Sequence, residues 1–365
     1  MTKRRANREG SIFKESSTGL WCAEISLPNG KRKKKRSKRQ QVVKEWLLEQ
    51  RTALRKGIFL ADDKTLFSDY LDRFLTDIAT PSLRPKTVDA YRWLIESHIK
   101  PNLGHHTLSQ IRPDHLQNLY TKKLDEGLSK RTVQHMHAVI RRSLNQALKW
   151  ELIVRNPASV VTAPTPDKKP PKTFTSDQAK QFLESVEDHR WYPIYVLAIT
   201  TGMRQGEILG LHWEDVDLAK GNLAVRHTIQ LLQGRIIEGE PKSAGSRRTI
   251  ALPEYTVAVL LLHQEKTGKD EGLLFTTSSG RPVSPRNLTR HFHLALDKAG
   301  LPKIRFHDLR HTAATLLLKE NVHPKIVQEM LGHSTIALTL DTYSHILPDI
   351  QQEAADKMDK IFGEV

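Results

Sequence analysis

The stretch that decides the fold is residues 201–207, TGMRQGE, which directly follows the apolar run at 193–199. The apolar run predicts a buried helix, and Gly202 predicts a turn after it. Arg204 then begins the next segment, and Glu207, three residues later, is placed to hold its guanidinium in a buried ion pair. The stretch predicts a fixed cation that can bind an anion.

A second basic motif, HDLRH, occupies residues 307–311. His307 and Arg310 are three residues apart at a predicted helix start, so they project from one face, where free backbone N–H groups add positive potential. A capped helix with ordinary surface contacts is the alternative. Zinc binding by His307 and His311, with His333 as third ligand, is a further alternative, but Arg310 would place a cation beside the ion and aspartate is shorter than the usual glutamate.

These basic residues are suited to the chemistry of a phosphodiester, whose oxygens gather negative charge in the transition state. Displacement at phosphorus also needs a nucleophile, and Tyr343 is the one tyrosine that follows His333 in the chain. A half-buried aromatic residue without a role is the alternative for any single tyrosine. Since a phenol has a pKa near ~10, local positive charge or a base must help it ionise.

Length and charge limit the class of protein. A chain of 365 residues is too long for one ordinary domain, and its net charge of +16 makes a polyanion the first partner to consider. Residues 1–57 hold 17 Lys and Arg against 5 Asp and Glu, so most of the excess lies there. A single cysteine, Cys22, excludes an intrachain disulfide and a cysteine-based zinc finger. With no apolar run long enough to span a bilayer, we expect a soluble, cytoplasmic protein.

The first part, residues 1–57, reads as a small sheet with a helix. Residues 20–27 alternate as a half-buried strand, residues 28–30 (PNG) turn the chain, and residues 42–54 have helical spacing. The second strand is basic, and its register would hold alternate cations on one face along a DNA groove. A solvated edge strand or a localisation signal is the alternative. The DNA-binding candidates here are Lys31, Arg32, Lys33, Lys34, Lys35 and Arg36.

The second part, residues 62–154, has the pattern of four helices. We expect them to begin near Thr65 (as a cap), at Pro85, at Pro113 and after the cap Ser129. Basic residues at helix starts and on polar faces are candidates for phosphate contacts. They are Arg84, Lys86, Lys130, Arg131 and Arg141.

The prolines of residues 155–172 predict an extended linker. Residues 173–365 mix helices with a small sheet between 223 and 252, including a hairpin at Gly234, and end in an amphipathic stripe from Ile350 to Phe362. The predicted fold class is therefore multidomain and mainly α. It combines a small N-terminal β-sheet plus helix, a four-helix domain and a mixed α+β C-terminal domain.

Four motifs in this order and spacing carry a resemblance: TGMRQGEILGL at 201–211, HDLRHT at 307–312, LGHS at 331–334 and DTYSH at 341–345. They resemble the catalytic boxes of the tyrosine recombinase, or phage integrase, family. The four-helix part resembles the core-binding domain of that family. The basic sheet and helix resemble the arm-type DNA-binding domain of integrases from phages and conjugative transposons.

The resemblance implies roles for the matching positions. Tyr343 would attack the scissile phosphate, form a 3′-phosphotyrosyl link and release a 5′-hydroxyl. Arg204 and Arg310 would clamp the non-bridging oxygens.

The remaining matched positions are His307, His333 and Lys242. The two imidazoles would donate hydrogen bonds or move the proton of the nucleophile, and Lys242 would protonate the leaving oxygen. Two guanidiniums and an ammonium supply the charge that metal ions give elsewhere, so we expect no cofactor and no metal.

The predicted function is a site-specific DNA recombinase, an integrase that integrates or excises a phage genome or another mobile element. Its expected partners are double-stranded DNA with core and arm sites, three further copies of the chain in a tetramer on DNA, an accessory DNA-bending protein and an excisionase. A type IB topoisomerase-like enzyme that relaxes DNA, and a non-catalytic DNA-binding protein, are the alternatives.

Overall fold

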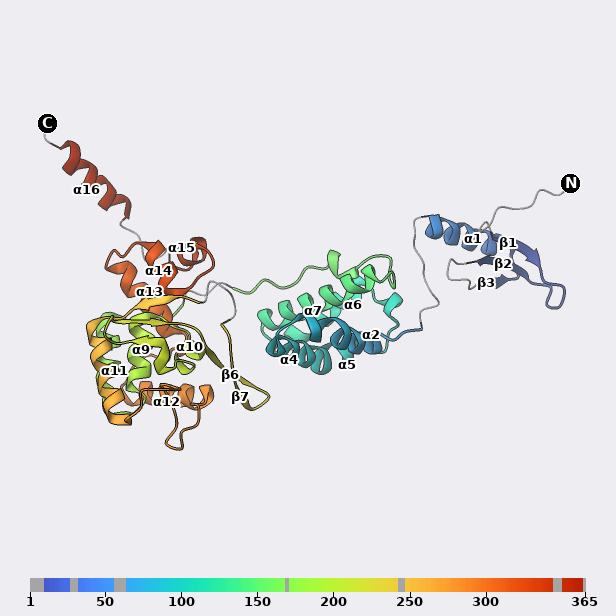
Figure 1. Ribbon diagram of the computed structural model, residues 1–365. Coiled ribbons are helices and arrows are strands. Elements are labelled where there is room, and N and C mark those ends of the chain that lie inside the picture. The colour runs from blue at the N-terminus through green and yellow to red at the C-terminus, as the bar shows by residue number, and fades with distance from the viewer. Residues whose placement is uncertain are drawn as a thin grey trace. The chain divides into compact units, whose positions relative to one another are not determined.

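The computed structural model describes residues 10–26, 32–55, 64–167, 171–241, 247–343 and 350–363 (Figure 1). Lys31, Lys242 and the side chain of Tyr343 lie outside this description. The chain separates into two compact units, Met1–Lys168 and Lys169–Val365. No helix in the described ranges combines the length and apolarity that crossing a membrane requires.

The N-terminal part is an antiparallel sheet of β1 (Ser11–Lys14), β2 (Trp21–Ser26) and β3 (Arg32–Ser37), packed on helix α1 (Gln40–Arg55). Ala23 and Ile25 of β2 and Val43 and Leu47 of α1 form its core. The expected pair of strands and the helix are confirmed. Strand β1 was not expected, because four residues are too short to show a period of two.

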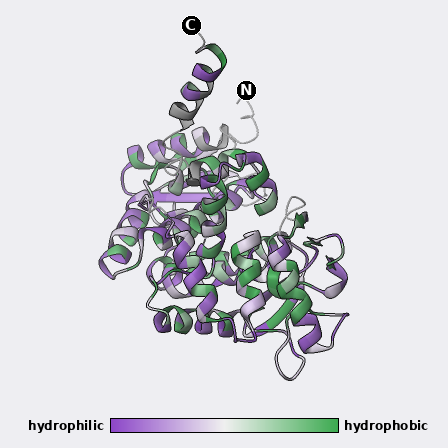
Figure 2. Cartoon of the chain, turned by 90° about the vertical axis from the view of Figure 1, so that its left-hand side faces the viewer, coloured by the Kyte–Doolittle hydropathy of each residue, from purple (hydrophilic) through white to green (hydrophobic). Residues whose placement is uncertain are grey.

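The helical part that follows has a core of its own. Its elements are α2 (Phe67–Phe74), the π-helical turn η1 (Leu75–Ala79), α3 (Thr80–Ser82), α4 (Pro85–Leu94), the π-helical turn η2 (Ile95–Ile99), α5 (Lys100–Leu103), the 3₁₀ turn η3 (Leu108–Gln110), α6 (Pro113–Asp125) and α7 (Lys130–Lys149). Four helical stretches result, as predicted. Figure 2 shows that helices of the chain carry both hydrophobic and hydrophilic residues, the composition of helices that pack on a core.

One of the two predicted helix caps is correct. The Ser129 hydroxyl accepts the N–H of Thr132 at 3.1 Å and caps α7. Thr65 does not cap α2, whose N-cap is Leu66. The reason is that the Thr65 carbonyl accepts the N–H of Leu108, next to an antiparallel bridge between Leu66 and Thr107. Thr65 therefore has extended backbone that pairs with another segment.

The expectation of extended chain is wrong for part of residues 155–172. A 3₁₀ turn, η4 (Pro157–Val160), lies there, and Ala158 is buried in the helical core. Asn156 caps the turn through its side chain and donates to the carbonyl of Arg141. Proline is compatible with the first position of a helix, where its missing N–H costs no hydrogen bond.

The second unit surrounds α9 (Tyr192–Thr201), which is buried along nearly its whole length. The elements after it are α10 (Gln205–Leu209), the 3₁₀ turn η5 (Trp213–Asp215), β4 (Val216–Asp217), β5 (Asn222–Ala224), β6 (Thr228–Leu232), β7 (Arg235–Gly239), β8 (Thr249–Ala251), α11 (Glu254–Thr267), α12 (Pro285–Lys298), α13 (Asp308–Lys319), α14 (Pro324–Leu331), α15 (Ile336–Tyr343) and α16 (Ile350–Phe362); α8 (Ser176–Ser185) precedes it.

Strands of the second unit form a three-stranded antiparallel sheet in the order β4-β5-β8 and the separate hairpin β6-β7. The hairpin turns at Gln233 (φ 49°) and Gly234 (φ 77°), two consecutive left-handed residues that suit a two-residue turn. The hairpin predicted at Gly234 is confirmed.

Candidate active site

Arg204 is positioned by the turn between α9 and α10. Gly202 ends α9 in the left-handed conformation (φ 61°), and Arg204 is the N-cap of α10. Glu207 accepts the Arg204 backbone N–H at Oε2 (3.0 Å) and its Nη1 at Oε1 (2.6 Å). The ion pair predicted from the sequence is confirmed, and it leaves the Arg204 side chain 37% exposed.

Arg248, for which no role was predicted from the sequence, is a second cation that pairs with Glu207. Its Nη2 lies 2.9 Å from Glu207 Oε2, and its Nε donates to the Met330 carbonyl at 2.6 Å. Burial opposes ionisation of Glu207, but the charges of Arg248 and Arg204 prevail and lower its pKa. The Arg247-Arg248 doublet, close after Lys242 in the sequence, was the available signal.

Arg310 reaches the same turn from α13. It is 3% exposed, and its Nη1 donates to the Gly202 carbonyl at 2.9 Å. Because Gly202 precedes Arg204 by only two residues, the turn that carries Arg204 is the turn that Arg310 contacts. The prediction that the two arginines converge is supported by this contact.

His307 and His311 lie at the start of α13, with ring centroids 5.2 Å apart. His307 keeps one side open to solvent. The surrounding protein, and then the charges of His311, Arg310 and Arg305, lower the His307 pKa to about 4. The carboxylate of buried Asp308 is engaged by Arg305, with an Nη2–Oδ1 distance of 2.7 Å. Asp308 therefore orders the helix start, which does not favour the alternative in which His307, His311 and His333 bind zinc.

His333 follows Gly332, the left-handed C-cap of α14. Its Nδ1 lies 2.9 Å from Oγ1 of buried Thr339 in α15. Burial, followed by the charges of Arg310 and Arg204, lowers the His333 pKa to about 4. Because the charges of both arginines reach this imidazole, His333 lies in their vicinity.

Tyr343 is the last residue of α15, four residues after Thr339. One helical turn therefore separates the backbone of Tyr343 from the residue that contacts His333. The described residues thus bring together Arg204, Arg248, His307, His311, Arg310 and His333, next to the helix that ends at Tyr343.

The basic strand β3 places Arg32, Lys34 and Arg36 on one face of the N-terminal sheet, as alternation requires. Acidic residues share that face. Glu24 pairs with Arg32 (2.9 Å) and Lys34 (3.2 Å), and Glu15 pairs with Arg36 (2.9 Å). Lys33 and Lys35 alternate with these, opposite Ile25 and Ala23 in the register.

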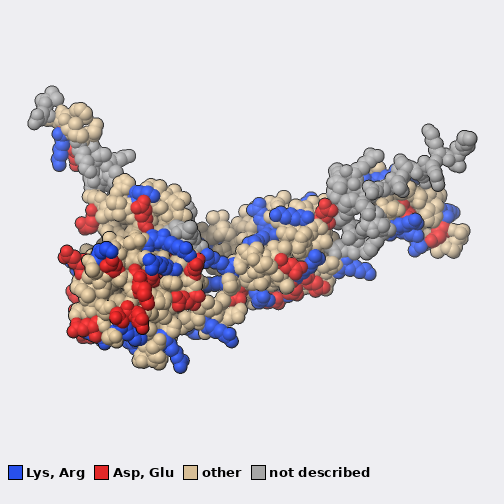
Figure 3. All heavy atoms as spheres, in the orientation of Figure 1, with Lys and Arg blue, Asp and Glu red and all other residues tan. Residues whose placement is uncertain are grey.

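In the helical part, the five candidate residues for phosphate contacts, Arg84, Lys86, Lys130, Arg131 and Arg141, are all exposed. Lys130 pairs with Asp167 at 3.2 Å. On the face in Figure 3, acidic side chains lie among the basic ones over both the helical and the C-terminal parts. All five side chains are therefore accessible to DNA, and their exposure does not distinguish which of them contact it.

A basic cleft beside Arg204 was also missed. It measures ≈ 770 Å³ and is lined by Gln205 of α10 and by the first turns of α12, including Arg286 and Arg290. Gln205 donates to the carbonyl of Pro285 at 3.1 Å, which joins α10 to α12. Arg286 and Arg290 are four residues apart, a spacing that places them on one face of a helix and was the signal for a shared basic face.

Comparison with known proteins gives matches to one family over most of the chain. Residues 172–349 match the phage integrase family, and residues 66–124 match the phage integrase N-terminal SAM-like domain. A tyrosine recombinase XerC-like protein of Caldanaerobacter subterraneus is 28% identical over 85% of this chain and 86% of its own length. The Tn1549 transposon integrase in complex with a circular intermediate DNA has a TM-score of 0.72 at 21% identity, over 80% of this chain and 100% of that chain. A lambda integrase tetramer bound to a Holliday junction has a TM-score of 0.60 at 19% identity, over 91% of this chain and 97% of that chain.

The family matches define an enzyme that recombines DNA at specific sites through a tyrosine. Its relatives include integrases of phages and of conjugative elements. The chain belongs to the phage integrase family of tyrosine recombinases.

Proposed function

We propose that this recombinase cleaves DNA by attack of Tyr343 on the scissile phosphate, which leaves a 3′-phosphotyrosyl link and a free 5′-hydroxyl. Arg204 and Arg310 bind the non-bridging oxygens and compensate the charge that grows on them. The hydrogen bond from Arg310 to the Gly202 carbonyl supports this proposal most directly, because it links Arg310 to the turn that carries Arg204.

His307 and His333 supply neutral imidazoles in the free enzyme. Their pKa values of about 4 mean that neither ring is charged near neutral pH. A neutral imidazole has one N–H donor and one acceptor nitrogen, so it can donate to a phosphate oxygen or receive the phenolic proton. Lys242 is proposed as the acid that protonates the leaving oxygen.

The energy of the phosphodiester is retained in the phosphotyrosyl bond. Attack by the 5′-hydroxyl of a partner strand breaks the phosphorus–tyrosine bond, forms a new phosphodiester and returns the proton to Tyr343. No nucleotide is consumed, because one ester replaces another at each step.

We further propose the assembly and the roles of the parts. Residues 62–154 and 173–365, joined by residues 155–172, bind a core site, and residues 1–57 bind arm sites. Four copies act on two core sites through a four-way junction, on the chromosome in the host cytoplasm, with a DNA-bending protein and an excisionase as accessory partners. The lambda integrase tetramer on a Holliday junction supports this assembly by its likeness in fold.

A suicide substrate, a core-site duplex nicked so that the released strand diffuses away, tests the nucleophile. The wild type and Tyr255→Phe, which changes a half-exposed tyrosine of α11, are expected to form a covalent protein–DNA adduct. Tyr343→Phe is expected to bind the duplex without forming it. An adduct with Tyr343→Phe would contradict the assignment.

Two further outcomes separate the alternatives. Binding without an adduct in every variant, the wild type included, would favour a DNA-binding protein without catalysis. Relaxation of supercoiled DNA with no exchange between two core sites would favour a topoisomerase-like enzyme.

A further inference from the structure

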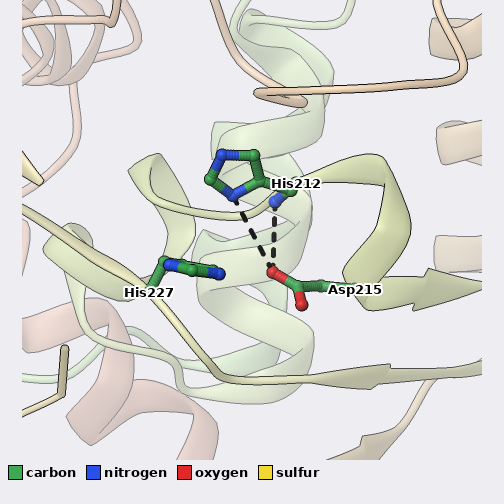
Figure 4. Close-up of side chains that lie close together, drawn as sticks. All are labelled: His212, Asp215 and His227. Carbon is green, nitrogen blue, oxygen red and sulfur yellow. Dashed lines mark hydrogen bonds and ion pairs between the residues drawn. The ribbon is translucent and has the colours of Figure 1, made fainter. Parts of the chain in front are cut away.

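A group of metal-ligand residues lies around η5 and the base of the β6-β7 hairpin (Figure 4). His212 is the N-cap of η5, Asp215 is its last residue, and His227 directly precedes β6. One potential ligand atom from each lies within 4.8 Å of the others. The sequence separates His227 from the other two, so no local motif announced the group.

The Asp215 carboxylate is buried and has one oxygen with weak local contacts. Arg226 Nη1 lies 3.3 Å from Oδ1. Oδ2 accepts the backbone N–H of His212 at a long 3.4 Å. Oδ2 can therefore serve as a monodentate ligand, while Arg226 fixes the carboxylate from outside the coordination sphere.

The two nitrogens of His212 face different carboxylates. Nδ1 is shielded from solvent, makes no hydrogen bond within the described part of the chain, and lies 3.9 Å from Asp215 Oδ2. Nε2 lies 3.5 Å from Oε1 of Glu238 in β7. Coordination through Nδ1 with donation of Nε2–H to a carboxylate is the outer-shell pattern of metal-bound histidines.

Glu238 brings a second carboxylate to the group. Its Oε1 also lies 3.3 Å from His227 Nδ1, so both imidazoles contact it. Two imidazoles and two carboxylates thus converge from η5, the segment before β6, and β7.

We propose that His212, Asp215 and His227 bind one zinc-type divalent ion, with water as the fourth ligand and Glu238 as the hydrogen-bond acceptor outside the coordination sphere. Imidazole nitrogen and carboxylate oxygen are ligands of Zn²⁺ in proteins. Ligand atoms around a tetrahedral zinc are about 3.3 Å apart at Zn–N distances of ~2.0 Å. The partly exposed rings of His212 and His227 reach that spacing by small side-chain rotations.

The ion would join the hairpin to the core of the second unit. In the described ranges β6 and β7 pair with each other and with no other strand, and β7 is exposed along its whole length while Ile229 of β6 is buried in the core. Binding would fix β7 through Glu238, four residues ahead of Lys242. The inference is independent of the proposed cleavage chemistry, because metal binding is measured without DNA.

The test uses the full-length protein, stripped of metal with a chelator and titrated with Co²⁺, whose tetrahedral complexes absorb in the visible. The wild type is expected to bind one equivalent with a visible band, and Zn²⁺ is expected to displace it. His227→Ala is expected to lose the band and to bind at least ~10-fold more weakly. His135→Ala, an exposed histidine of α7, is the matched control and is expected to keep both.

A second readout is hydrogen exchange at residues 228–239, which Zn²⁺ is expected to slow in the wild type and in His135→Ala but not in His227→Ala. Identical Co²⁺ titrations of the wild type and His227→Ala would overturn the proposal. That result would move binding to another group, such as the neighbouring rings of His105, His106 and His115. Absence of saturable Co²⁺ binding by the wild type would overturn it equally.

Discussion

Arg310 donates to the carbonyl oxygen of Gly202 at 2.9 Å, across 108 residues of sequence. Gly202 has a left-handed backbone (φ 61°) and is closely packed. A Cβ at this position would lie 2.5 Å from Cδ2 of Leu331 in α14 and 3.4 Å from Cβ of Ala313 in α13. The turn that carries Arg204 is therefore packed against α13 and α14. Helix α13 contains Arg310, and α14 ends just before His333.

Gly202→Ala is expected to destabilise the protein by about 2–5 kcal/mol. The left-handed conformation costs alanine ~1–2 kcal/mol, and the steric clash adds ~1–3 kcal/mol. Gly268→Ala is the matched control, because Gly268 also has φ 61° and ends α11, yet a Cβ there meets no heavy atom within 4 Å. The free energy of unfolding in urea measures both. Equal losses would show that contact with Leu331 does not constrain the turn.

Arg248→Lys is expected to slow DNA cleavage about 10²-fold, since small misplacement of a catalytic group has effects of that size. Arg248 uses separate nitrogens for Glu207 and the Met330 carbonyl, and a lysine ammonium cannot reproduce that planar fork. Freed from Arg248, Glu207 would hold Arg204 in a different position.

The adjacent Arg247→Lys is the control for that substitution. Arg247 pairs with Glu240 at 2.7 Å, but both side chains are more than half exposed, and such pairs contribute little. The rate of adduct formation and the affinity for a core site are measured for both variants. Equal rates for Arg248→Lys and Arg247→Lys would remove Arg248 from the positioning of Arg204.

Protonation of His333 is expected to make the fold less stable in mild acid. Its pKa is about 4 in the folded chain and ~6.5 when exposed, so between these values the unfolded state binds more protons. Stability therefore rises with pH across this window and becomes level above it. We choose His333 because it is half-buried, whereas His307 is open to solvent on one side.

The measurement is the free energy of unfolding at pH 5 and at pH 7.5. His333→Gln is expected to reduce the difference between the two values. Gln328→Ala removes a 2.7 Å hydrogen bond to the His333 carbonyl and no titrating group, so it should keep the wild-type difference. An unchanged difference in His333→Gln would show that this imidazole does not titrate with unfolding.

Sequence reasoning succeeded where the physical cause was local. The Arg204–Glu207 pair spans three residues at a helix start, and Ser129 caps a helix within its own first turn, so spacing was sufficient. Thr65 was assigned wrongly as a cap because its backbone pairs with a segment about forty residues away. Arg248 was missed because Glu207 and Met330 lie 41 and 82 residues from it. Periodicity carries no information about contacts between residues so far apart in the sequence. That Arg204, Arg310 and His333 share one site was predicted from the resemblance of the motifs to a known family.

The described apolar side chains of helix α16 are open to solvent. Met358, Ile361 and Phe362 are 53%, 68% and 65% exposed, and three such residues on one short helix suit a surface that another copy of the chain covers. Truncation after Pro348 is expected to reduce recombination between two core sites more than binding to one site. Ile361→Gln with Phe362→Gln should act in the same direction, because the helix is kept and only its apolar face is lost. Leu262→Gln, at a 55% exposed position of α11, is the control and should leave both quantities as in the wild type. Gel-shift titration of a single core site and a two-site recombination assay give the two quantities, and a parallel decline in both would assign α16 to the folding of its own subunit instead.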